Sequence, residues 1–455
     1  MSDYNFLMES RLSPQQMQVV SKVSRISSAQ SLNLYLVGGA VRDLTLGQQT
    51  VRDLDFVVEG NPQRVLRALE AASSGLVGAA EHGAEVEHLV LDRRLNAAEV
   101  RFSSGVRAEI AASRNEIHSK AGRPPEILPA MIFEDLKRRD FSANAMAISL
   151  HPNSRGLLLD PTNGAADIAR REFRVLHSRS FLEDPSRIYR LLRLSQRLDF
   201  KAEERTRTLL ESAIQNRGWE EMTPEQQGLE LRAILQEDNP GRVLKMLAER
   251  DLLRGLDRKL ASARIPYDRF ARIRSAVRAL PGADAFLLNF HCLVEKLGSA
   301  QQNRLAQKIL VEAKTIKSAL ELDRAARKLA RLLGSSRAAR PSQVYTLLSQ
   351  YPQYLLLFLL VYYPQVRVQS RVKSYLFKFP QVRARLPRAQ LQAIGMPPGP
   401  KFEKIMERVY LDQLDGKLRS ESQLLKELRA LSGIKEPVAK PPTRVRAARR
   451  GGKKG

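Results

Sequence analysis

Residues 32–60 read LNLYLVGGAVRDLTLGQQTVRDLDFVVEG and predict two strands separated by a glycine turn and a helix. The run LNLYLV is short and apolar, as in a buried strand, and Gly38 and Gly39 end it. AVRDLTLG then suits a short helix, and VRDLDFVVEG predicts a second buried strand with acids at its start. This order places backbone N–H groups and a helix N-terminus where a phosphate can bind.

The mixed pattern of strands and helices continues on both sides of this stretch. Helices are expected at 14–30 and 62–72, and further strands around EHLVLDRR (87–94) and NAAEVRFSSGVRAEIAA (96–112). From the turn DPTNG (160–164) to about residue 430 the pattern is that of amphipathic helices. We therefore predict a small α/β domain with one open sheet face, followed by an all-helical remainder.

The charge of the chain indicates a polyanionic partner. Seventy-five Lys and Arg against 49 Asp and Glu give a formal net charge of +26. Such a surplus is typical of proteins that displace counterions from nucleic-acid phosphates, and the alternative is a solvated basic surface. The single cysteine, Cys292, excludes an internal disulfide and favours a reducing cytoplasm. No signal peptide is visible, and the apolar run 354–363 is too short to span a membrane.

Two acids on the second strand are candidate metal ligands. Asp53 and Asp55 lie two residues apart, so both side chains would project from one face of the strand. Carboxylates at this spacing can hold Mg²⁺, and Glu109 is the natural third acid if its strand lies alongside. Three acids around two magnesium ions suit phosphoryl transfer. A pair of acids on a strand is weak by itself, because surface acids explain most such pairs.

The glycine pair strengthens this interpretation. Gly38 and Gly39 stand between strand and helix, and Arg42 lies one turn into that helix, where it could contact a triphosphate. A simple tight turn is the alternative for the glycines alone.

A second candidate segment is LKRRDFSANAMAI (136–148). The apolar residues around Arg138 and Arg139 indicate a partly buried segment. A buried arginine requires an anionic partner, so we expect one here.

The segment FLEDPSRIYRLLRLSQRLDF (181–200) predicts a helix with a cationic stripe. Pro185 suits its first turn, and Arg187, Arg190 and Arg193 recur every third residue. Asp184 and Arg187 together offer an acceptor and donors that could imitate a base-pairing edge. The alternative is an ordinary helix with an acidic start and a basic surface.

These motifs together resemble the class II tRNA nucleotidyltransferases, whose close relatives are bacterial poly(A) polymerases. The resemblance covers residues 34–200, where five motifs occur in the family's order, and it weakens afterwards. The motifs are LVGGAVRD (36–43), RDLDFVVEG (52–60), KRRDFSANAMAI (137–148), LLDPTNGAADI (158–168) and FLEDPSRIYRLLR (181–193). Residues 394–425 also look like the C-terminal segment of longer bacterial members.

The resemblance assigns roles to the candidate residues. It implies that Asp53 and Asp55 bind two Mg²⁺ ions and that Glu109 is a supporting acid. It implies further that ATP and CTP are substrates and that Asp184 and Arg187 select them without a nucleic-acid template. The other implied nucleotide-binding residues are Gly38, Gly39, Arg42, Arg139, Arg190 and Arg193.

The family's architecture implies a catalytic head at 1–160, a helical neck at 161–265 and a helical body and tail at 266–432. A disordered basic tail would follow at 433–455, either as an RNA tether or merely solvated. The expected partner is the acceptor end of tRNA. The candidate backbone-contacting residues are Arg367, Arg371, Lys373, Lys378, Arg383, Arg385 and Arg388, and a solvated basic face is the alternative for them.

Two departures from the family pattern bear on function. Gln226 stands where the family often has an arginine, which puts in doubt how the neck helix is braced. The segment RNEIHSKAGRPPE (114–126) carries His118 where relatives commonly have an aromatic residue. This segment resembles the family's flexible loop and is not obviously shortened, which favours an enzyme that can add the terminal A.

The sequence therefore predicts a cytoplasmic enzyme that adds C, C and then A to tRNA. Addition of A alone, poly(A) synthesis and addition of CC alone stay open within the family. A non-catalytic RNA-binding protein of the same fold is the alternative outside it, although it would be expected to have lost at least one of the three acids. The oligomeric state stays open.

Overall fold

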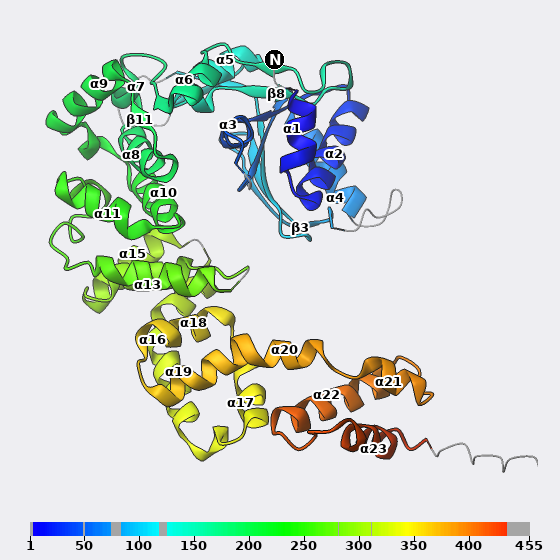
Figure 1. Ribbon diagram of the computed structural model, residues 1–455. Coiled ribbons are helices and arrows are strands. Elements are labelled where there is room, and N and C mark those ends of the chain that lie inside the picture. The colour runs from blue at the N-terminus through cyan, green and yellow to red at the C-terminus, as the bar shows by residue number, and fades with distance from the viewer. Residues whose placement is uncertain are drawn as a thin grey trace, which may run out of the picture. The chain divides into compact units, whose positions relative to one another are not determined.

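The computed structural model describes residues 3–48, 51–73, 83–117, 125–280, 282–310 and 312–434. The chain divides into two compact units (Figure 1). The first comprises residues 1–271 and 289–317, and the second comprises 272–288 and 318–455. The boundaries expected at 160, 265 and 432 stay a prediction, and residues 435–455 of the expected basic tail lie outside the described residues.

A seven-stranded mixed sheet forms the centre of the N-terminal part, which confirms the predicted α/β fold class. Only β2 and β5 pair in parallel, and the other neighbouring strands are antiparallel. The strands, in their order across the sheet, are β3 (Val86–Asp92), β4 (Ala97–Phe102), β5 (Arg107–Ala112), β2 (Leu54–Glu59), β1 (Asn33–Val37), β8 (Ala147–Ser149) and β9 (Leu158–Leu159).

Helices cover one face of this sheet fully and the other in part. Figure 1 shows α2 (Pro14–Ala29) and α4 (Pro62–Ser73) together against one face, beside α1 (Tyr4–Arg11). The helix α5 (Ile132–Lys137) packs on the other face, where Ile132 and Leu136 join Val57 in a small core. Because side chains alternate along a strand, Asp55 shares this second face with Val57, beyond the part that α5 covers.

Two predictions about strands were wrong. Segment 96–112 is a hairpin of β4 and β5, because Gly105 adopts φ +82° and its N–H donates to the carbonyl of Phe102 at 2.8 Å, closing a tight turn. Asp53 does not lie on the second strand, which begins at Leu54. The partner strand β1 ends at Val37, opposite Asp55, and Gly38 then turns away, so no ladder partner on that side reaches Asp53.

Short elements connect the sheet to the helical part of the first unit. A separate hairpin consists of β6 (Arg114–Ile117) and β7 (Glu126–Pro129), and β10 (Glu172–Phe173) pairs with β11 (Lys201–Ala202). The remaining helices up to residue 309 are α3 (Gly39–Thr45), α6 (Gly164–Arg170), α7 (Ser180–Glu183), α8 (Ser186–Leu198), α9 (Glu204–Gln215), α10 (Pro224–Leu235), α11 (Pro240–Glu249), α12 (Leu253–Leu256), α13 (Tyr267–Arg278), α14 (Phe286–Val294) and α15 (Ser299–Ile309).

The described part of the second unit is helical. Its helices are α16 (Ala313–Gly334, shared with the first unit), α17 (Pro341–Leu348), α18 (Gln353–Tyr362), α19 (Val366–Lys373), α20 (Phe379–Ala384), α21 (Arg388–Ala393), α22 (Pro400–Leu414) and α23 (Glu421–Ser432). The apolar run 354–363 forms the buried helix α18, as predicted. Of the described helices, none alone is long and apolar enough to cross a membrane, and only α17 with α18, bent by 117°, would pass as a pair.

Candidate active site

A cavity of about 300 Å³ lies beside the second face of the sheet, a volume at the small end of the range for ligand pockets. Most of the predicted site residues line it: Gly38, Gly39, Asp55, Glu109, Arg139, Asp184, Arg187 and Arg190. An adjoining cavity of about 220 Å³ is lined by the other three, Arg42, Asp53 and Arg193, and shares Gly39, Asp55 and Arg190 with the first. Residues from head and neck segments more than 140 positions apart are thus brought to one place.

The parallel pairing of β2 with β5 explains why two acids meet here. Its register sets Asp55 directly beside Glu109. The pKa of Asp55 is raised from 3.8 to about 7, mainly by burial and in part by the charges of Glu109 and Asp53, against the opposing effect of Arg139 and Arg190. Crowded carboxylate oxygens of this kind fit a hard divalent cation such as Mg²⁺, which would relieve their repulsion.

The third acid points elsewhere. Asp53 Oδ1 lies 3.1 Å from Nη2 of Arg107, at the start of β5. Within the described ranges, no three His, Cys, Asp or Glu side chains are grouped closely enough to hold a metal ion. The predicted trio is therefore only partly assembled: Asp55 and Glu109 share the first cavity, whereas Asp53 meets Asp55 in the second.

Gly38 is required by the close approach of two site side chains. Its backbone has φ +68°, and a Cβ added there would lie 3.2 Å from Arg139 Nη1 and 3.3 Å from Asp55 Oδ2. A side chain at this position would be strained and would also push both functional groups away. The glycine predicted from the turn pattern thus has a second role, which is to leave room for the charged groups.

Arg42 is more deeply embedded than predicted. Its side chain is 2% exposed and donates through Nε and Nη2 to Asp43 Oδ1, at 2.8 and 2.7 Å. Its Nη1 donates to Asn144 Oδ1 at 2.6 Å. A triphosphate contact by Arg42 stays a prediction, because these contacts already use the guanidinium group.

A chain of polar contacts runs from Arg42 to the helix α8. Asn144 donates through Nδ2 to both oxygens of Asp140, at 3.1 and 3.2 Å, and Asp140 forms an ion pair with Arg190. Burial alone would raise the pKa of Asp140, but Arg190 and Asn144 outweigh it and keep that pKa below its usual value. The contacts thus connect α3, which follows the glycine turn, to Arg190 on α8.

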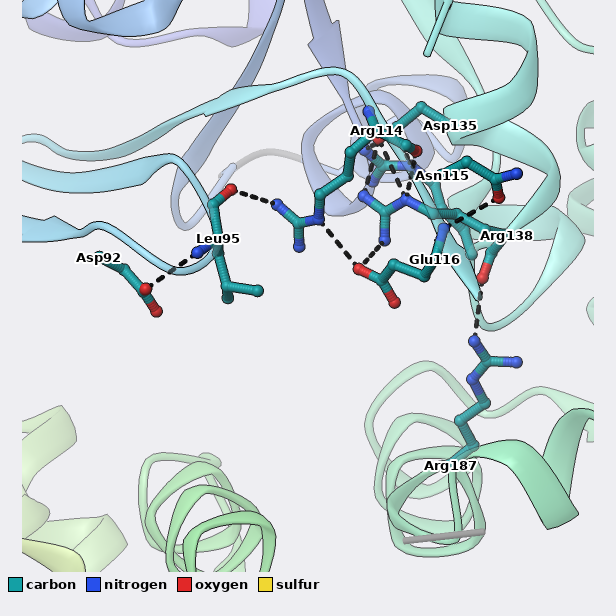
Figure 2. Close-up of polar contacts among 9 residues, drawn as sticks. Asp92, Leu95, Arg114, Asn115, Glu116, Asp135, Arg138 and Arg187 are labelled. Carbon is teal, nitrogen blue, oxygen red and sulfur yellow. Dashed lines mark hydrogen bonds and ion pairs between the residues drawn. The ribbon is translucent and has the colours of Figure 1, made fainter. Parts of the chain in front are cut away.

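Asp135 is the anionic partner expected for the two arginines of segment 136–148. It is fully buried, and its Oδ1 accepts from Nε and Nη2 of Arg139 at 3.1 and 2.8 Å. Its Oδ2 accepts from Nε and Nη2 of Arg138 at 3.2 and 2.7 Å (Figure 2). One carboxylate on α5 therefore orients Arg138 and Arg139, which both line the first cavity.

Figure 2 shows how this cluster extends to the hairpin and to α8. Glu116 on β6 accepts from Arg138 Nη1 at 2.8 Å and from Arg114 Nε at 2.9 Å. On its other side, the backbone carbonyl of Arg138 accepts from Arg187 Nη2 at 2.9 Å. Arg138 therefore links the base of the hairpin to the helix that carries Arg187.

Asp184 and Arg187 lie side by side in the wall of the first cavity. Asp184 follows α7 and precedes α8, and its Oδ1 accepts from the N–H and the Oγ of Ser186 at 3.0 and 2.6 Å. Arg187 donates through Nη1 to Ser180 Oγ at 2.7 Å, and its Nε lies 3.8 Å from Asp184 Oδ2. The pair presents a carboxylate acceptor next to guanidinium donors, as the sequence predicted.

Comparison with known proteins fits this site. Residues 34–174 match the model of the poly(A) polymerase head domain. An A-adding tRNA nucleotidyltransferase of Halalkalibacterium halodurans is 27% identical to 95% of this chain, over 96% of its own length. Residues 34–174 are thus similar to a poly(A) polymerase head domain, and nearly the whole chain is similar to tRNA nucleotidyltransferases.

Two further relatives differ in the product that their names give. A CC-adding tRNA nucleotidyltransferase of Deinococcus radiodurans is 35% identical over 52% of this chain, which spans only 59% of that protein. A solved CCA-adding enzyme in complex with ATP has a TM-score of 0.50 and 26% identity, covering 95% of this chain and 99% of its own. The names of these relatives therefore differ in the nucleotides that they give.

The cationic stripe of α8 is less free than the sequence indicated. Arg190 is exposed, but Arg193 is buried and donates through Nη1 to Glu237 Oε1 at 2.9 Å. The same glutamate accepts from Arg52 Nη1 at 3.3 Å, beside Asp53. Glu237 therefore connects Arg193 on α8 with Arg52, the residue before Asp53.

The predicted RNA-binding residues occur on and between α19 and α21, in the second unit. Three of them have partners within the protein: Arg371 donates to the Leu333 carbonyl, Arg383 pairs with Glu407 at 2.7 Å, and Arg388 pairs with Glu403 at 2.8 Å. The other four are exposed, namely Arg367, Lys373, Lys378 and Arg385. Contact with RNA stays a prediction for the whole set.

Sequence reasoning missed the residues that orient the site. Asp135 could have been found, because its spacing of three and four from Arg138 and Arg139 is that of helical ion pairs. Glu116 and Asn144 had no local signal for these roles. Glu116 accepts from Arg138 and Asn144 accepts from Arg42, in each case across more than 20 residues of chain. Position 118 and the rest of 118–124 of the expected flexible loop lie outside the described residues.

The raised pKa of Asp55 predicts a pH-dependent stability of the metal-free protein. Between 3.8 and about 7, the folded protein holds a proton here that the unfolded chain has released. Folding is thus favoured as the pH falls through this window. Above the window, Asp55 is ionised and its buried charge opposes folding. Asp55→Asn is expected to raise the thermal midpoint at pH 8 in EDTA, with the gain vanishing near pH 4. Melts across this range test this, and a gain independent of pH would contradict it.

Proposed function

We propose that this protein is a template-independent nucleotidyltransferase that completes the CCA end of tRNA from CTP and ATP. One observation carries the proposal: the acceptor and donor pair Asp184 and Arg187 lines the same cavity as the acids Asp55 and Glu109. The pair that could recognise a base and the acids suited to phosphoryl transfer therefore line one nucleotide-sized cavity. The net charge of +26 supports a nucleic-acid substrate.

The base is selected by the protein itself in this mechanism. Adenine and cytosine both carry an exocyclic amine, which Asp184 can accept from, beside a ring nitrogen that Arg187 can donate to. Uracil and guanine present a carbonyl oxygen at the corresponding edge, which would face the carboxylate unfavourably. The site would thus accept ATP and CTP without an RNA template.

The reaction joins the tRNA 3′-hydroxyl oxygen to the α-phosphorus of the bound nucleotide, while the bond from that phosphorus to the bridging oxygen of pyrophosphate breaks. Asp53 and Asp55 would hold Mg²⁺, with Glu109 in support, and a bound metal supplies a lowered pKa of the attacking hydroxyl and charge for the leaving group. Arg139 and Arg190 line the cavity beside Asp55 and offset phosphate charge. The hydroxyl proton leaves to solvent, and pyrophosphate is released.

Addition of A alone is the second candidate. The relative matched over nearly the whole length of both chains is named as an A-adding enzyme. The same pair of residues would serve that reaction, since Asp184 and Arg187 can form the hydrogen bonds described above with adenine alone.

Extension of three labelled tRNA transcripts separates these functions. The transcripts end before CCA, after C and after CC, and each is incubated with CTP, ATP or both in the presence of Mg²⁺. Completion of all three with a stop at CCA supports the proposal. Extension of the CC-ended transcript alone by one A identifies an A-adding enzyme, and long A ladders identify a poly(A) polymerase. No incorporation would refute every one of these and favour an RNA-binding protein.

Arg187→Ala is expected to lower kcat/KM for ATP and CTP about 100-fold, and for UTP much less. The change removes donors to the base, and hydrogen bonds to charged groups contribute about 1.5–3 kcal/mol each. Single-nucleotide extension of a tRNA transcript measures this. Arg207→Ala on the exposed side of α9 is the matched control and should act like the wild type. Equal losses for all four nucleotides would contradict a role in base selection.

A further inference from the structure

The first turn of α10 contains a residue, Gln226, that uses both ends of its side-chain amide. Gln226 Oε1 accepts from the backbone N–H of Thr223 at 2.9 Å, and the N–H of Gln226 donates to Thr223 Oγ1 at 3.2 Å. This capping box fixes the orientation of the amide, because an oxygen must face Thr223. The amino group of Gln226 then points in the other direction.

That amino group reaches the base-reading carboxylate. Gln226 Nε2 donates to Asp184 Oδ1 at 2.9 Å, across 42 positions of chain. The same oxygen also accepts from the N–H and Oγ of Ser186. Oδ1 is thus saturated by donors from two residues, whereas the contact found for Oδ2 is Arg187 Nε, at 3.8 Å.

We propose that Gln226 is a positioning residue that sets the selectivity for adenine and cytosine by fixing the rotation of the Asp184 carboxylate. With Oδ1 held, Oδ2 is the oxygen offered to the exocyclic amine of the base. Gln226 is not among the described residues that line the cavity, so it acts through Asp184. This inference rests on the proposed function, in which Asp184 reads the base.

The neutral amide also explains how a glutamine can stand where the family often has an arginine. An arginine beside Oδ1 would bring a second full positive charge to a carboxylate that already faces Arg187. A glutamine supplies the hydrogen bond and leaves the negative charge of Asp184 for the amine of the base. The glutamine at this position therefore braces Asp184 without adding charge.

The substitution Gln226→Glu separates this role from helix capping. Glutamate keeps the acceptor for Thr223 and so keeps the capping box, but its ionised carboxylate cannot donate to Asp184. Gln226→Ala loses both functions. Gln227→Glu is the matched control, because Gln227 lies one residue further on and contacts Met222 and Lys308 instead.

The readout is kcat and KM for single additions of ATP, CTP and UTP to tRNA transcripts, with thermal midpoints for each variant. Gln226→Glu and Gln226→Ala are expected to lower the ATP-to-UTP ratio of kcat/KM about tenfold or more, mainly through KM, while Gln227→Glu keeps it. Parallel losses for all nucleotides, or a loss in Gln226→Ala alone, would overturn the inference and leave a capping role. Asp184→Ala is measured alongside: unchanged selectivity there would instead refute the base-reading role in the proposed function.

Discussion

Asp55→Asn is expected to lower the rate of nucleotide addition at least about 10³-fold, while binding of tRNA and ATP stays within a few fold. Asp55 is the acid common to both cavities and lies in register beside Glu109. Asparagine has nearly the same shape but no negative charge, so the variant loses the group that would hold Mg²⁺ without opening the cavity. Single-turnover extension of a labelled tRNA, with binding measured separately by filter retention, tests this.

The control for this variant is Asp92→Asn, at the exposed end of β3 in the same sheet. Asp92 accepts from the backbone N–H groups of Arg94 and Leu95 at a surface turn, so its replacement should leave the rate unchanged. A loss in Asp55→Asn of less than about tenfold would exclude a metal-holding role. Loss of tRNA binding together with the rate would show that the substitution acts through the fold.

The sheet and the glycine turn could be predicted because their signals are local. Apolar runs, the pair Gly38 and Gly39 and the helical spacing of Arg187, Arg190 and Arg193 each lie within a few residues. The hairpin at 96–112 was missed because its alternating pattern continues through the turn, and only Gly105 marks the reversal. The local sequence pattern thus predicts which helices and strands form more reliably than it predicts where they end.

The roles of the charged residues were harder to predict, because they depend on partners far away in the chain. Asp184 and Arg187 were expected to act as a pair, which stays a prediction, and their orientation comes from Ser180, Gln226 and the carbonyl of Arg138. A triphosphate contact by Arg42 also stays a prediction, and no local pattern indicated that its Nη1 donates to Asn144, 102 positions away. A sequence pattern names a charged group, whereas tertiary contacts decide which of its atoms stay available.

The same reasoning identifies Asp135 as the most costly side chain to remove from the site. Asp135→Asn is expected to destabilise the protein by about 3–5 kcal/mol, because two largely buried arginines lose an ionised partner and Arg138 alone keeps another, Glu116. Burial alone would raise the pKa of Asp135, yet Arg139 and Arg138 lower it below its usual value. The stabilisation is therefore present above the unfolded pKa and is lost only as the pH falls through the lower, folded value.

Urea unfolding of the variant between pH 5 and 9 should show this loss at a constant size, since Asp135 stays ionised throughout the range. Glu220→Gln is the control, because it breaks an exposed helical pair with Arg217 in the same unit and should cost less than about 1 kcal/mol. Arg138 and Arg139 would also lose their fixed orientation, so nucleotide addition should fall even where the variant is fully folded. A loss below about 1 kcal/mol for Asp135→Asn would mean that the two arginines find other partners, and that α5 does not organise the cavity as inferred.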